Sequence, residues 1–136
     1  MKKFTHIMLL CSVFILLACS TNTENLVSAP DDDDENPIEN VSYANQVQPI
    51  FNSSCTSCHG SNGGVNLSSF SLLMGSVGNN YGNQLVVPND ADASGLVDKL
   101  EPSPDHGSRM PIGSSPLSST QIETIRTWIN EGATNN

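Results

Sequence analysis

The stretch Cys55-Thr56-Ser57-Cys58-His59 constrains the fold of this chain more than any other feature. Its two cysteines are separated by two residues, about one helical turn, and a histidine follows the second directly. This pattern is typical of covalent haem attachment, in which each thiol adds to a vinyl group and the adjacent imidazole reaches the iron from the proximal face. The sequence therefore predicts one covalent haem c, held by Cys55 and Cys58, with His59 as an iron ligand.

The N-terminus has the pattern of an exported protein. A positively charged start, Met1-Lys2-Lys3, precedes an uncharged apolar stretch at 7–17, which is shorter than the roughly 20 residues of a membrane-spanning helix. The following Leu16-Leu17-Ala18-Cys19 resembles the lipobox of bacterial lipoproteins, in which the cysteine is acylated and becomes the new N-terminus. We expect residues 1–18 to be a signal peptide and Cys19 to carry lipid; an ordinary signal peptide with an incidental cysteine is the alternative.

Removal of the signal peptide would change the number of free cysteines and fix where the protein is located. Cys11 would be lost with the signal peptide, so only the two motif cysteines would remain free of lipid. The mature protein would be anchored to a lipid bilayer of the bacterial cell envelope rather than threaded through it. Ser20 gives no retention signal of the aspartate kind, which favours the outer membrane, facing the periplasm or the cell surface.

Residues 19–40 are predicted to form a disordered acidic linker. The chain has 136 residues and a net charge of -9, and loss of Lys2 and Lys3 leaves three Lys and Arg against 14 Asp and Glu, or -11. Seven of these acids lie at 20–40 among Ser, Thr, Asn and Pro, with no aromatic residue. Such a segment cannot bury enough apolar area to fold, so a solvated spacer is favoured over a calcium site or a sorting signal. The acidic balance also disfavours nucleic acid as a partner.

Residues 41–136 are predicted to form one small all-α domain of about four short helices with long loops. Three Lys and Arg against seven Asp and Glu give it a net charge of -4. Ser42 is a candidate helix cap, Pro49 is expected to kink or shorten the helix that follows it, and Ser118-Ser119-Thr120-Gln121 reads as a capping box. The predicted helices lie at about 42–51, 68–75, 94–100 and 119–131.

Zinc binding and thioredoxin-like redox chemistry are the alternatives for the cysteine motif. Zinc needs two further ligands, and the mature chain offers only His106 besides His59. A thioredoxin-like pair would lie at a strand-to-helix turn in an α/β pattern, which this sequence lacks. Both observations, together with export, favour haem.

The second axial ligand of a haem decides between electron transfer and ligand binding. Met110 lies in a proline-flanked loop before the last predicted helix and is the expected ligand. The alternatives are that Met110 is only a packing residue or that His106 coordinates instead. Met74 lies in an apolar run and is expected to be a core residue. Arg109 is a candidate partner of a haem propionate, or else an exposed loop cation.

Several segments together resemble a known family. Its pattern is matched by Val47-Gln48-Pro49-Ile50-Phe51, the haem motif with Gly60, Val86-Val87-Pro88, Ser94-Gly95-Leu96, Met110-Pro111 and the segment 117–133. These resemble a class I c-type cytochrome, most closely the planctomycete-type small cytochrome c domain, here as a bacterial lipoprotein. The resemblance implies a cytochrome c-like fold in which Cys55 and Cys58 form thioethers, His59 and Met110 are the axial ligands, and the first and last helices cross near the haem. Ile112 departs from the second proline that this family often has there.

The predicted function is that of a membrane-anchored electron carrier, not an enzyme, with an unknown redox protein as partner. One alternative is an accessory module of a cell-surface complex, in which the haem only stabilises the fold of the domain. The other is a ligand-binding sensor or peroxidase in which Met110 dissociates. The porphyrin would complete a small core, so the haem-free domain is expected to fold poorly. The residues expected to bury it are Phe51, Leu67, Phe70, Leu85, Leu96, Ile125 and Trp128.

Overall fold

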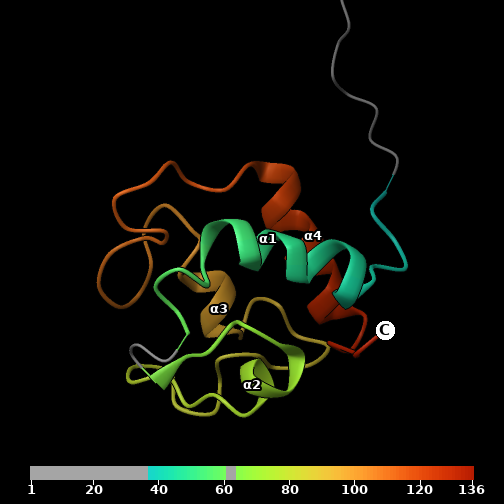
Figure 1. Cartoon of the computed structure of the whole chain (residues 1–136), viewed down its shortest axis with the longest axis horizontal. Helices are drawn as coiled ribbons and strands as arrows, with labels where there is room; N and C mark the ends of the chain where they lie inside the picture. Colours follow the sequence, from blue (N-terminus) through green and yellow to red (C-terminus); the bar gives the residue numbers. More distant parts are fainter. Residues whose placement is uncertain (1–36, 61–63) are drawn as a thin grey trace, which may run out of the picture. The chain divides into compact units, whose positions relative to one another are not determined.

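The computed structural model describes residues 37–60 and 64–136 (Figure 1). Within these ranges the protein is helical and contains no β-strand, only an isolated bridge between Gly78 and Gly82. No described helix is long and apolar enough to cross a membrane. The prediction of an all-α domain with about four short helices is confirmed. The elements are a π-helical turn η1 (Tyr43–Val47), α1 (Gln48–Ser54), α2 (Phe70–Met74), α3 (Gly95–Asp98) and α4 (Ser119–Asn130).

The predicted signal peptide, the lipidation site Cys19 and most of the acidic linker lie outside the described residues. Of the linker, only 37–40 is described. Here Glu131, which follows α4, accepts the Asn40 N–H at 2.6 Å and the Val41 N–H at 2.8 Å. The start of the domain is thereby joined to the end of its last helix.

Pro49 determines how the first helix is built. The Ser42 hydroxyl caps η1 by accepting the Asn45 N–H at 3.2 Å, as predicted. Proline has no N–H and its ring clashes with the carbonyl four residues back in a regular helix. Here the chain makes a wider turn, in which the Gln48 N–H donates to the Tyr43 carbonyl, and Pro49 lies in the first turn of α1, where its missing N–H costs little.

Both ends of α4 follow local sequence signals. Ser118 and Gln121 form the predicted capping box, each side chain accepting the other residue's N–H. At the other end, Gly132 has φ +99° and its N–H donates to Ile129, while the Ala133 N–H donates to Trp128. These two hydrogen bonds form a Schellman motif, which stops the helix one residue before the predicted end.

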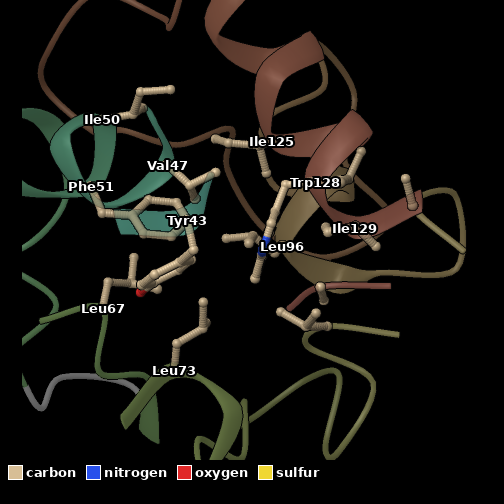
Figure 2. Close-up of a cluster of buried hydrophobic side chains, with 14 of the residues drawn as sticks. Tyr43, Val47, Ile50, Phe51, Leu67, Leu73, Leu96, Ile125, Trp128 and Ile129 are labelled. Carbon is tan, nitrogen blue, oxygen red and sulfur yellow. The ribbon is translucent and has the colours of Figure 1, made fainter. Parts of the chain in front are cut away.

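The core lies where η1 packs against α4, and Figure 2 shows Trp128 projecting from α4 toward the first helical segment. The Tyr43 ring lies 5.1 Å from Trp128 and 5.2 Å from Phe70, between ring centroids. Tyr43 itself is buried, its hydroxyl donates to Gln48 at 2.7 Å, and burial raises its pKa to about 12. These aromatic contacts join three segments distant in sequence and hold η1 against α4.

The expectation that Met74 is a core residue is wrong. Met74 is 37% exposed and Leu72 is 47% exposed, whereas Leu73 is buried. With only five residues, α2 presents a single narrow face to the core, and that face is occupied by Leu73 and the partly buried Phe70.

Candidate haem site

The cysteine motif forms a tight turn at the C-terminal end of α1. The Cys55 N–H continues the helix by donating to Phe51 at 2.8 Å. The Cys55 carbonyl then accepts the N–H groups of both Cys58, at 3.1 Å, and His59, at 2.8 Å. Beyond the motif, the His59 carbonyl accepts the Leu67 N–H at 2.9 Å. The main chain of Cys55, Cys58 and His59 is thus fixed by hydrogen bonds on both sides.

The two thiols differ in environment. Cys55 is half-buried and packs against the core, and burial raises the pKa of its thiol to about 11. Cys58 is exposed. Reactive redox cysteines have lowered pKa values and commonly sit at helix N-termini, whereas this pair follows a helix C-terminus. The environment of Cys55 therefore disfavours the thioredoxin-like alternative.

A cavity of about 610 Å³ brings together the residues that the sequence singled out. Its volume is within the range of small-molecule and cofactor sites, roughly 300–1,000 Å³. Cys55, Cys58, His59 and Met110 all line it. Its other apolar walls are Val65, Leu67, Leu85, Leu96, Leu100, Pro111 and Ile112.

Both candidates for the second axial ligand are on the loop that closes the cavity. Met110 is half-buried, packs against the core and donates its N–H to the Lys99 carbonyl at 2.7 Å. The peptide bond to Pro111 is cis. His106 is exposed and its ring lies edge-on to Tyr81 at 5.2 Å. The loop that carries Met110 thus faces the same space as the cysteine motif.

Arg109 does not line this cavity. Its Nε donates to the Leu100 carbonyl at 2.6 Å, which ties the loop to the chain after α3. Lys99 and Tyr81 line the cavity instead, and sequence reasoning assigned neither a role. A signal existed for Lys99, because it is the only lysine beyond Lys3.

Only some of the residues expected to bury the haem line the cavity. Leu67, Leu85 and Leu96 do line the cavity. The other four residues expected there do not line the cavity; they lie in the core or pack against it. These are Phe51, Phe70, Ile125 and Trp128.

The chemistry of the donor set fits a covalent haem. Two thiols, an imidazole and a thioether converge on one largely apolar cavity, which is the donor combination of a His/Met c-type site. Zinc would need four ligands. In the described part of the chain, no group of three His, Cys, Asp or Glu side chains is placed to hold a metal ion.

Comparison with known proteins places the segment around this cavity in a family context. Residues 55–111 match the family model described as Planctomycete cytochrome C. The matched segment runs from the first cysteine of the motif to the proline after Met110. A cytochrome c domain implies haem-based electron transfer. The cytochrome c-like fold predicted from the sequence is confirmed.

A similar fold is found among solved structures. Hydrazine synthase from Kuenenia stuttgartiensis is similar with a TM-score of 0.50 and 23% sequence identity. The match covers 68% of this chain but only 16% of the hydrazine synthase chain. At this identity the similarity concerns the fold alone. No curated protein matches the sequence significantly.

Proposed function

We propose that the protein is a monohaem c-type cytochrome, an electron carrier anchored to the bacterial envelope through acylated Cys19. The observation that carries this proposal is the shared cavity, which is lined by both motif cysteines, His59 and Met110. The bound haem would supply a one-electron Fe(II)/Fe(III) couple.

Each of these residues has a distinct task. Cys55 and Cys58 would hold the cofactor as thioethers, and the hydrogen-bonded turn between them limits movement of His59. Met110 would supply the second iron ligand, and its thioether, together with the His59 imidazole, would favour the ferrous state and raise the reduction potential. The apolar walls, among them Leu85 and Leu96, would limit the access of water to a bound haem and so raise its potential further.

The redox partner is proposed to be a protein that docks at the open side of this cavity. Ile112 lines the cavity and is 67% exposed, so an apolar contact is available at the rim. Because the domain beyond residue 40 carries a net charge of only -4, its partner need not be strongly basic.

Substitution of Met110 tests the axial ligation. The matured ferric protein should show an iron–sulfur charge-transfer band, and Met110→Ala should abolish it and lower the midpoint potential. Met74→Ala is the matched control, since Met74 is exposed on α2 and does not line the cavity. A wild-type protein without the band, whose spectrum changes in His106→Ala, would transfer the ligand role to His106.

The lipid anchor is tested separately. We expect the full-length protein to partition with membranes and Cys19→Ser to appear in the soluble fraction. Membrane association that persists in Cys19→Ser would contradict the proposed anchor without affecting the haem assignment.

A further inference from the structure

The loop that carries Met110 is held in place from α3 and the two residues that follow it. Residues 101–110 contain no helix or strand and are mostly exposed. Such a loop opens easily unless its backbone is tied down. Hydrogen bonds from residues 105–110 lead to three successive residues, Asp98, Lys99 and Leu100.

Lys99 contacts the loop at three alternate positions. Its ammonium donates to the carbonyls of His106 and Ser108, each at 2.5 Å, and its own carbonyl accepts the Met110 N–H at 2.7 Å. Gly107, between the two carbonyls, has φ +68°, a left-handed conformation that favours glycine. A Cβ there would lie 3.6 Å from the Lys99 Nζ, so the loop closes directly over the ammonium.

Asp98 provides a second attachment beside it. Its carboxylate accepts the Tyr81 hydroxyl and the Asp105 N–H, the latter at 3.0 and 3.1 Å. The ion pairs recorded in the described ranges all involve Arg126. The Lys99 ammonium donates its hydrogen bonds to two loop carbonyls, and charged donors make the stronger hydrogen bonds.

We infer that Lys99 is a positioning residue for the distal ligand: it holds the 106–110 loop over the cavity and keeps the Met110 thioether in place against competing ligands. This inference rests on the proposed function. Its consequence is that loss of the ammonium lets an external ligand replace Met110 more easily, while the cysteine motif and His59 are untouched.

The test is imidazole competition on the matured, full-length ferric protein. Imidazole displaces the thioether, so the charge-transfer band reports occupancy by Met110. Lys99→Met removes the ammonium and keeps the apolar stem, and it should lower the imidazole concentration for half-displacement about tenfold, the equivalent of about 1.4 kcal/mol. Lys99→Arg, which restores charged donors, should recover most of the wild-type resistance.

Arg126→Gln is the matched control, because it removes one positive charge whose ion pairs lie with Asp92, Glu101 and Glu123. It should leave imidazole affinity unchanged even if it lowers the unfolding midpoint. Equal imidazole affinity in Lys99→Met and wild type would overturn the inference. If Lys99→Met fails to mature, Lys99→Gln replaces it with the same criterion. A wild-type protein that lacks the band altogether would refute the Met110 assignment instead, so the two failures are distinguishable.

Discussion

Replacing Gly95 with alanine is expected to destabilise the domain, although alanine is the better helix former. Gly95 is the first residue of α3 and is buried against the Tyr81 ring. A Cβ at this position would overlap the Cγ and Cδ1 atoms of Tyr81 and lie 2.7 Å from its Cβ. These atoms are next to the backbone, so rotation of the ring alone does not relieve the overlap.

The expected size follows from two opposing effects. Alanine gains at most about 1 kcal/mol of helix propensity, and less at the first position of a helix. Overpacking costs about 1–3 kcal/mol. The net prediction is about 1–2 kcal/mol of destabilisation, because Tyr81 must shift and its hydroxyl is held by Asp98. With a urea m-value of about 1–3 kcal/mol/M, the midpoint should fall by roughly 1 M.

Urea denaturation of the matured protein, followed by far-ultraviolet circular dichroism, measures this effect. Gly78→Ala is the matched control, since its Cβ would lie 3.8 Å from the Cβ of the same Tyr81, an ordinary van der Waals contact. Its midpoint should stay close to that of the wild type. A Gly95→Ala protein as stable as the wild type, or more stable, would refute the packing of α3 on Tyr81.

Three further predictions concern the cap of α4, acid stability and haem dependence. Ser118→Ala removes the capping box and should lower the free energy of unfolding by about 1 kcal/mol in the same urea assay; no change would contradict the cap. Burial raises the pKa of Asp98, but its hydrogen bonds and the nearby positive charges outweigh this and lower it below 3.8. Its stabilisation is therefore present above this pH and lost as the pH falls through the lowered value, so Asp98→Asn should be less stable than wild type at neutral pH and equal to it in strong acid. A difference that persists in acid would contradict this sign. The Cys55→Ser, Cys58→Ser protein should show weak circular dichroism and no sharp thermal transition, whereas a fully folded haem-free domain would contradict the haem-dependent core.

The parts of the fold that could be predicted from the sequence are those specified by neighbouring residues. The Ser42 cap, the capping box at Ser118 and the stop at Gly132 each depend on a few residues close together in the chain. The cysteine motif is equally local, and it lies at the cavity as expected. Such signals survive folding because their hydrogen bonds form within one helical turn.

What could not be predicted depends on contacts between distant segments. Phe51 and Trp128 were expected at the haem but pack in the core, because their place depends on how the first helical segment packs against α4. The exposure of Met74 could not be read from the apolar run 72–74, because the fold alone decides which of these residues faces the core, and Leu73 takes that position. The three loop contacts of Lys99 depend on how residues 106–110 fold back over α3. A loop has no hydrophobic periodicity from which such contacts could be predicted.

The central claim is that this chain holds one covalent haem with His/Met ligation. The most direct test is the mass of the denatured protein, together with its visible spectrum, after expression with haem-maturation machinery. We predict a mass increase of one haem and a low-spin spectrum with the iron–sulfur band. An unmodified mass would contradict the account, and so would a haem that is lost on denaturation.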